Sequence, residues 1–462
     1  MKHRGPALLS ALGVTVLVLV TSLGAANPGV TLIGIGLVPG GALDKSGLDG
    51  QSICSFDNAA NCIDQATLGG FGSALAYTGF DSVFVAVPDR GPFDGRTDVP
   101  YRDRVHYVHF AIDGGAAFPN IRTTLLDTVF LKATGNQDLV GSSADFGARF
   151  DPEGASVSGA GSFFISDEYG PAILEFNRLG HLLHRVAVPD KFLIANPSGN
   201  VDADGNSLEL YPALNTSGRQ ANRGMEGLAI SPDGRHLFGL MQNALIQDNG
   251  LNAATPPGRV GLTARLLKVE LQTGATAEYV YVVDAINQGR GVNDILAIND
   301  HEFLVIERDN RSLVPTPPNA AQTPNLKRIY KIDLTGATDV SGVASLPATG
   351  AALGGLGIVP VTKSLFIDLL DSSYVVDAST TPKRTIKDVI AEKIEGLAWG
   401  PDLADGRHVL YLISDNDLFP GRPTQVYAFA IDAAAAGINL VPQQVGGPMF
   451  PPGQLKKALR QQ

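Results

Sequence analysis

Six times along the chain a short apolar run opens at a small or acidic residue, and the next apolar run ends in a polar, mostly acidic cluster. Glu153 opens the run Glu-Gly-Ala-Ser, and the run that follows it ends at Asp167 and Glu168. In an antiparallel hairpin, the start of the first strand and the end of the second lie at the same end of the sheet. The acids are therefore predicted to converge on one face. Five comparable units run from Ser73 to Arg90, Glu226 to Asn243, Asp294 to Asp309, Gly354 to Asp371 and Glu395 to Asp417.

Crowded carboxylates repel one another, and a bound cation relieves that repulsion. Hard oxygen ligands favour calcium or magnesium over zinc, so the pattern predicts a calcium site. For any single acid, capping of a turn or pairing with a nearby arginine is the alternative explanation. The predicted metal ligands are Glu153, Asp167, Glu168, Glu226, Asp294, Glu307, Glu395 and Asp415.

Three arginines, Arg90, Arg223 and Arg308, lie among these acids in the sequence. A guanidinium presents a planar fork of donors that fits phosphate or carboxylate oxygens. They are the predicted substrate-binding residues for a small anionic ester held on the acidic face. Structural salt bridging to the acids is the alternative.

The elements that must position these residues are short strands. Runs of β-branched and aromatic residues alternate with turns, for which 53 glycines and 29 prolines are available, and helical periodicity is nearly absent. Units that repeat at roughly 40 to 80 residues are typical of radial β architectures. We therefore predict an all-β fold, a β-propeller of six (possibly seven) blades. The segment 27–70 is expected either to close the ring with the C-terminal strands or to form a seventh blade.

The N-terminus has the pattern of an export signal. Lys2 and Arg4 precede a nearly uninterrupted apolar run at 7–23, and small residues follow at 24–26. We predict a cleaved signal peptide at 1–26, a single mature domain at 27–462, and a periplasmic or extracellular location; an uncleaved anchor helix is the alternative. No second run is long and apolar enough to predict a stable membrane span. The two cysteines, Cys54 and Cys62, are predicted to form a local disulfide rather than a metal pair.

Composition narrows the range of partners and reactions. The formal net charge of −11 makes nucleic acid and anionic membranes unfavourable partners. The sequence has no Gly-x-Ser-x-Gly elbow, no Ser-x-x-Lys, no His-Glu-x-x-His and no P-loop, so common serine hydrolase, zinc protease and nucleotide-binding signatures are missing.

Several motifs occur in an order that resembles a known family. They are Val-Pro-Asp-Arg-Gly-Pro-Phe-Asp-Gly at 87–95, Phe-Ile-Ser-Asp-Glu-Tyr-Gly-Pro at 164–171, Asn-Arg-Gly-Met-Glu-Gly-Leu-Ala at 222–229, Val-Asn-Asp-Ile-Leu-Ala at 292–297, Ile-Glu-Arg-Asp at 306–309, Lys-Ile-Glu-Gly-Leu-Ala at 393–398 and Ser-Asp-Asn-Asp at 414–417. The chain, over about 65–432, resembles the phytase-like family described as having esterase-like activity.

The resemblance implies a mechanism as well as a fold. β-Propeller phytases are calcium-dependent phosphomonoesterases, in which a Glu-Gly strand and a following acid-ended strand supply calcium ligands. By this likeness Glu153, Asp167 and Glu168 are the expected catalytic residues, with calcium neutralising phosphate charge and activating water. This chain has fewer acids and few clustered lysines, so phytate is not carried over as its substrate.

Three functions are therefore to be compared. The first is an exported, calcium-dependent phosphoric (or other) ester hydrolase. The second is a non-catalytic, calcium-stabilised propeller that binds a ligand or protein. The third is a lactonase-like or strictosidine-synthase-like propeller, in which one central metal activates water against a carbon ester.

Overall fold

The computed structural model describes residues 27–142, 147–199, 207–284, 291–316 and 319–445. The predicted signal peptide at 1–26 lies outside these residues. β-Strands dominate the described chain, in agreement with the expected fold class, and its one α-helix, α1, spans only Ala433–Ala436. Within the described residues, no helix has the length and apolarity needed to cross a membrane.

Most strands belong to five four-stranded antiparallel groups. The first group contains β4 (Ala74–Tyr77), β5 (Val83–Val87), β6 (Arg104–Ile112) and β7 (Ile121–Phe130), and the second contains β8 (Pro152–Val157), β9 (Phe163–Asp167), β10 (Ala172–Phe176) and β11 (Leu182–Val186). The third contains β12 (Met225–Ile230), β13 (His236–Met241), β14 (Thr263–Glu270) and β15 (Thr276–Val282), and the fourth contains β16 (Gly291–Ala297), β17 (Glu302–Arg308), β18 (Lys327–Asp333) and β19 (Thr362–Asp368). The fifth contains β22 (Lys393–Trp399), β23 (His408–Asp415), β24 (Thr424–Ile431) and β1 (Val30–Val38).

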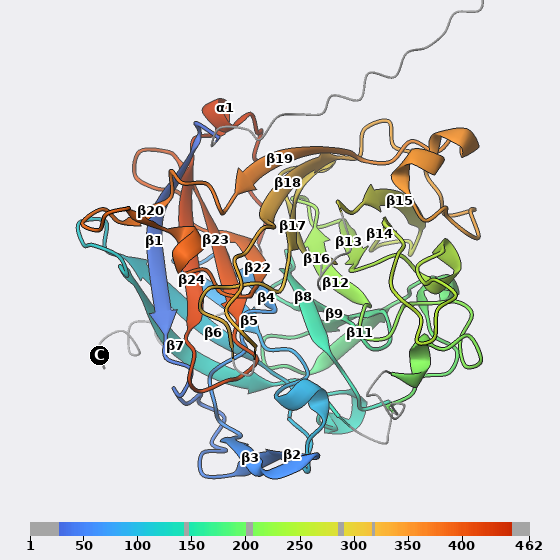
Figure 1. Ribbon diagram of the computed structural model, residues 1–462, viewed down its shortest axis with the longest axis horizontal. Helices are drawn as coiled ribbons and strands as arrows, with labels where there is room; N and C mark the ends of the chain where they lie inside the picture. Colours follow the sequence, from blue (N-terminus) through green and yellow to red (C-terminus); the bar gives the residue numbers. More distant parts are fainter. Residues whose placement is uncertain (1–26, 143–146, 200–206, 285–290, 317–318, 446–462) are drawn as a thin grey trace, which may run out of the picture.

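The first strand of each group faces a common centre (Figure 1). These inner strands contact one another in the cyclic order β4, β8, β12, β16, β22 and back to β4. The hydrophobic core lies between successive groups, for example where Val85 and Val105 of the first meet Ile165 of the second. The result is a closed ring of sheets around one axis.

The N-terminal strand closes this ring. Strand β1 pairs antiparallel with β24, the third strand of the fifth group, and touches β7 of the first through a parallel bridge between Gly36 and Ile121. This contact joins the first and fifth groups into one eight-stranded sheet. The segment 27–70 therefore contributes a closing strand, the first of the two roles expected for it.

One of the six sequence units is not an inner hairpin. Its opening Gly354–Leu356 forms the 3₁₀ turn η7, and its second run is β19, the last strand of the fourth group. The described chain thus contains five four-stranded groups where the sequence pattern predicted six blades. The run at 354–357 resembles the start of the other units in sequence, but it pairs with no strand in the described structure.

The remaining elements are short. Strands β2 (Ser52–Ser55) and β3 (Asn58–Asp64) form a separate hairpin, and the predicted disulfide between Cys54 and Cys62 is confirmed within it. Strands β20 (Val375–Asp377) and β21 (Arg384–Thr385) form a second small pair. The other 3₁₀ turns are η1 (Phe93–Gly95), η2 (Thr134–Asn136), η3 (Asp190–Phe192), η4 (Leu208–Leu210), η5 (Ile246–Asp248), η6 (Gly350–Ala352) and η8 (Ile386–Asp388).

Glycine lets the inner strands approach one another closely. A Cβ atom at Gly154 of β8 would lie 2.3 Å from the Leu228 nitrogen of β12, and one at Gly227 would lie 2.8 Å from the Ile295 nitrogen of β16. Both distances are far below ordinary van der Waals contact. The glycine that follows each inner-strand glutamate is therefore required by the packing of the ring.

This contact gives a stability prediction. Gly154→Ala should lower the free energy of unfolding by about 1–3 kcal/mol, the usual cost of overpacking, measured by urea denaturation. Gly342→Ala is the matched control, because a Cβ there would meet no atom within 4 Å. Equal stability of the two variants would contradict the close approach of β8 and β12.

Candidate functional site

Bulges in the inner strands turn three glutamates toward one end of the ring. The pairing register shifts between Pro152 and Ala155 in β8, between Met225 and Gly227 in β12, and between Ile394 and Gly396 in β22. A bulge re-aims the side chain it contains. The residues inside these three bulges include Glu153, Glu226 and Glu395.

These glutamates line a cavity of about 210 Å³ at the end of the ring where the inner strands begin. Its lining side chains in the described part of the chain are all polar or charged, and acids outnumber bases. The lining residues are Asp89, Arg90, Asp94, Glu153, Glu168, Asn222, Arg223, Glu226, Gln242, Arg308, Asn310, Lys393 and Glu395.

Part of the set predicted from the sequence comes together here. The cavity collects four of the predicted acids and all three predicted arginines, namely Glu153, Glu168, Glu226, Glu395, Arg90, Arg223 and Arg308. The other four predicted acids do not line it. They are Asp167, Asp294, Glu307 and Asp415.

Two of these four cap backbone amides. Asp167 accepts hydrogen bonds from the amides of Asp151, Tyr169 and Gly170 at 3.1–3.2 Å. Asp294 accepts from the amides of Ile295 and Leu397, both at 2.8 Å, and so ties β16 to β22. Both carboxylates act as the turn and strand caps that the sequence left open as an alternative.

The other two are paired with lysines. Glu307 accepts from the Tyr281 hydroxyl at 2.6 Å and pairs with Lys363. Asp415 pairs with Lys393 at 3.3 Å and accepts from the Asp417 amide. These contacts are those of structural ion pairs.

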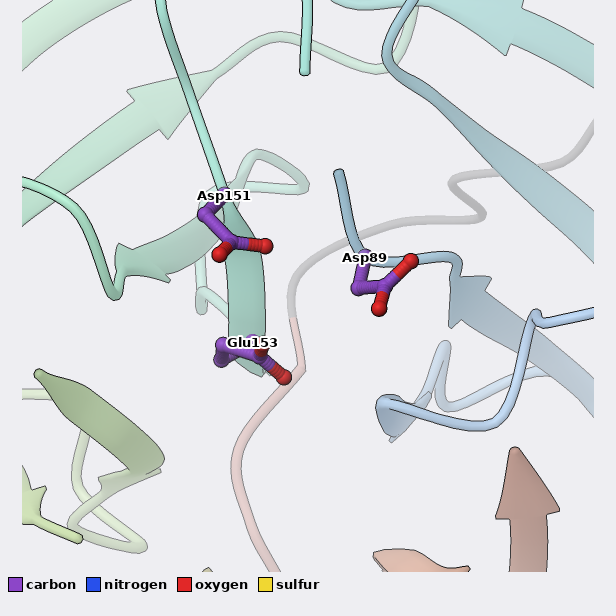
Figure 2. Close-up of side chains that lie close together, drawn as sticks. All are labelled: Asp89, Asp151 and Glu153. Atoms are coloured by element: carbon purple, nitrogen blue, oxygen red, sulfur yellow. The ribbon is translucent and has the colours of Figure 1, made fainter. Parts of the chain in front are cut away.

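Two overlapping groups of acids lie in and beside the cavity wall, and Asp151 is the one member that does not line the cavity. Oxygens of Asp89, Asp151 and Glu153 lie within 4.8 Å of one another, and so do oxygens of Glu153, Glu168 and Glu226. Figure 2 shows Asp89 facing Asp151 and Glu153 across a short gap, with the latter two on one stretch of chain. Glu153 belongs to both groups. It is therefore the carboxylate around which the site is built.

Asp89 and Asp151 were missed as site residues by the sequence reasoning. A signal for Asp151 was present, because residues two apart in a strand point to the same face and Asp151 stands two before Glu153. Asp89 ends the first hairpin in the same way that the other acids end theirs.

Burial makes these carboxylates hard to ionise. It raises the pKa of Asp89 and of Asp151 to about 7, partly offset in both by the charge of Arg90. Burial, and then the neighbouring carboxylates, also raise the pKa of Glu153 and of Glu226 well above the usual range. The ionised site therefore carries excess negative charge, which bound protons or a bound cation must neutralise.

The donor set fits a hard cation. Glu226 accepts hydrogen bonds at Oε1 from Gln242 and from Asn293, whereas its Oε2 is buried without a hydrogen-bond partner in the described part of the protein. The two acid groups offer carboxylate oxygens only. Oxygen ligands in this number suit calcium or magnesium rather than zinc.

The three arginines differ in what they bind. Arg90 pairs with Asp94 at 2.7 Å, with Asp151 at 2.9 Å and more loosely with Glu168 at 3.6 Å. Arg308 pairs with Glu395. Arg223 donates to the Asn222 carbonyl, and no carboxylate in the described ranges forms an ion pair with it. Arg223 is therefore the guanidinium best able to accept an anion from outside.

A fourth arginine, Arg259, lies near Arg223 and was not expected from the sequence. Burial, and next the charge of Arg223, lower the pKa of Arg259 to about 10. Two neighbouring guanidiniums repel each other, and an anion bound between them relieves that repulsion. Arg259 itself does not line the cavity.

The raised pKa values predict how stability depends on pH in the metal-free protein. The folded state holds protons on Asp89 and Asp151 up to about pH 7, whereas the unfolded chain releases them near pH 4. The free energy of unfolding should therefore fall as pH rises through this window. Melting temperatures at pH 5 and pH 8 measure the effect, with the lower value expected at pH 8.

Two variants test whether this pH dependence arises from the cavity carboxylates or from acids elsewhere on the surface. Glu226→Gln cannot ionise and should flatten the pH profile, whereas Glu270→Gln, which does not line the cavity, should leave it unchanged. A melting temperature that does not fall between pH 5 and pH 8 would contradict the buried-carboxylate account.

Comparison with known proteins agrees with the motif order. A family model described as "Phytase-like: Esterase-like activity of phytase" matches residues 66–418. An uncharacterized secreted protein of Arthroderma benhamiae is 26% identical over 471 residues, covering 84% of this chain and 86% of that protein. This secreted relative and the disulfide both agree with the predicted export.

Solved structures resemble the chain only weakly. A luciferin-regenerating enzyme has 11% identity and a TM-score of 0.31, covering 82% of this chain and 96% of its own. A calcium-binding regucalcin from Agrobacterium tumefaciens has 9% identity and a TM-score of 0.33, covering 82% and 95%. Overlap this low carries no argument about function. The family match does extend over most of the chain, and the chain therefore belongs to the phytase-like family with esterase-like activity.

Proposed function

We propose that this protein is an exported, calcium-dependent hydrolase of phosphate or other anionic esters. Its body would be one five-bladed β-propeller domain within 27–462, each four-stranded group being a blade. Family membership supports the activity, and the secreted relative and the disulfide support the export. The five cyclic contacts between inner strands support the blade count.

One observation carries the proposal. A single cavity holds carboxylates without cationic partners next to a guanidinium without a carboxylate partner among the described residues. Glu153 and Glu226 form no ion pair with any described residue, and Arg223 lies in the same wall. A site that binds a cation and an anion together satisfies both sets of charges.

The residues divide the work of ester hydrolysis. Glu153, Glu168 and Glu226 would hold calcium, with Asp89 beside them. Calcium, when bound, neutralises charge on the ester's anionic group and lowers the pKa of nearby water. Arg223 would orient the anionic group through its planar fork of donors. Arg90 and Arg308 would fix the cavity wall through their ion pairs.

The paired arginines also favour a second function. Arg90 already forms ion pairs with Asp94 and Asp151, and Arg308 forms one with Glu395. The same ion pairs would be found in a purely structural centre. A non-catalytic propeller that calcium only stabilises would have this arrangement. It differs from the hydrolase in one measurable respect, because calcium would raise its melting temperature without supporting turnover.

Turnover with and without calcium tests the proposal. The metal-stripped protein should release phosphate from p-nitrophenyl phosphate only after calcium is added, while p-nitrophenyl acetate is assayed beside it. Glu153→Gln should lose at least the ~10–100-fold in activity that follows loss of an outer-shell metal partner. Glu270→Gln serves as the matched control. Stabilisation by calcium without turnover would favour the binding protein, and turnover of the acetate alone would point to carbon esters.

The role of Arg223 is tested separately. Arg223→Ala should raise KM for p-nitrophenyl phosphate by about 10–100-fold, the equivalent of about 1.5–3 kcal/mol for a hydrogen bond to a charged group. Arg235→Ala removes an exposed arginine at the edge of the third blade and should leave KM unchanged. An unchanged KM in Arg223→Ala would show that this residue does not bind the substrate.

A further inference from the structure

A second, larger cavity adjoins the acidic one. Its volume is about 640 Å³, and it shares Asp89, Asp94 and Lys393 with the cavity that holds the acid groups. The two spaces are therefore adjacent and share part of their walls. We call the larger space the groove.

The chemistry of the groove differs from that of the acidic cavity. Its wall includes the apolar side chains Ile63, Pro92, Phe93, Leu418, Phe419 and Pro420. The acidic cavity has no apolar side chain among its described lining residues. A molecule that spans both spaces must therefore be charged at one end and largely apolar at the other.

The groove offers no free positive charge in its described lining. Lys393 is the one cation there, and it already pairs with Asp415 and Asp417. Asp94 and Asp417 are already paired with Arg90 and Lys393, and Asp89 adds a carboxyl group that forms no ion pair with a described residue. A second phosphate in the groove would meet these acids without a counter-charge, which is unfavourable. A substrate with several phosphates is disfavoured for the same reason.

The groove walls are fixed before any ligand binds. Ile53, Tyr101 and Leu418 form a buried hydrophobic cluster with Ile63 against it. The cluster joins the disulfide-closed hairpin β2–β3 to the loop that carries Phe419. Asn416 also donates to the carbonyls of Phe419 and Arg422. The hairpin and the loop are therefore anchored to each other.

Unusual backbone conformations concentrate along this wall. Phe93, Asp94, Asp417 and Leu418 have φ between 51° and 58°, a region that favours glycine. All four line the groove. Residues held in such conformations cost of order 1–3 kcal/mol each and cluster at ligand sites, where surrounding contacts maintain them.

We propose, on the basis of the hydrolase function above, that the substrate is a monoester joining one phosphate to a bulky, largely apolar alcohol. The phosphate would lie beside Arg223 and the acid groups, and the alcohol would lie in the groove against Phe93, Leu418 and Phe419. In hydrolysis, water forms a new P–O bond and the P–O bond to the alcohol breaks. One proton of the water ends on the alcohol, so the products are phosphate and the free alcohol.

A matched pair of substrates tests this specificity with calcium and the intact protein. Phenyl phosphate and 4-butylphenyl phosphate have the same reacting group and differ only in the apolar chain. The butyl ester should have kcat/KM at least ~10-fold higher, as contacts with an apolar pocket typically provide. Phytate should be turned over least. The comparison uses the unmodified protein and does not depend on any variant folding.

Variants then assign the preference to the groove. Phe93→Ala and Phe419→Ala should raise KM for the butyl ester ~10-fold and leave phenyl phosphate almost unchanged. Phe56→Ala is the control, because Phe56 lies in the turn of hairpin β2–β3, is 76% exposed and does not line the groove. Equal kcat/KM for the two esters, or a preference for phytate, would overturn the groove proposal alone. Failure to hydrolyse any of the three esters would overturn the proposed function itself.

Discussion

The close approach of the inner strands is the constraint on which the site depends. Gly154 and Gly227 leave room for the backbone of the next inner strand, and the bulges beside them turn Glu153 and Glu226 to the same end of the ring. Carboxylates carried by adjacent strands are thereby brought within a few ångströms of one another. The packing that closes the ring also creates a concentration of negative charge that the protein alone does not neutralise.

The protein neutralises part of this charge and leaves a remainder. Arg90 holds Asp151, Arg308 holds Glu395, and Lys393 holds Asp415, so the edges of the site are stabilised by pairs within the chain. Glu153 and Glu226 stay without cationic partners in the described structure, with Arg223 near them. Burial strengthens both the repulsion among the acids and the attraction for an external cation. The paired side chains therefore support the wall of the site, whereas the unpaired carboxylates form the centre that we propose binds a cation.

The sequence revealed the centre more reliably than its surroundings. Glu153, Glu226 and Glu395 were recognisable because Glu-Gly at the start of an apolar run recurs. Gly354-Gly-Leu-Gly resembles that pattern, yet it forms a 3₁₀ turn. The sequence of a short apolar run does not show by itself whether the run will pair with another strand. Asp294 occupies the same place as Glu226, but it caps Leu397, and Asn293 faces the site instead. The place of Asp89 and Arg259 beside the site depends on contacts between distant segments, which local spacing does not encode.

Calorimetric titration of calcium into the metal-free protein tests the central claim most directly. At pH 7, in two buffers of different ionisation enthalpy, we expect saturable binding accompanied by proton release, because carboxylic acids that hold protons near neutral pH must lose them to bind a cation. Glu153→Gln and Glu226→Gln should each weaken binding strongly, and Glu270→Gln should not. Absence of binding, or equal affinity in all four proteins, would contradict a metal centre built on Glu153.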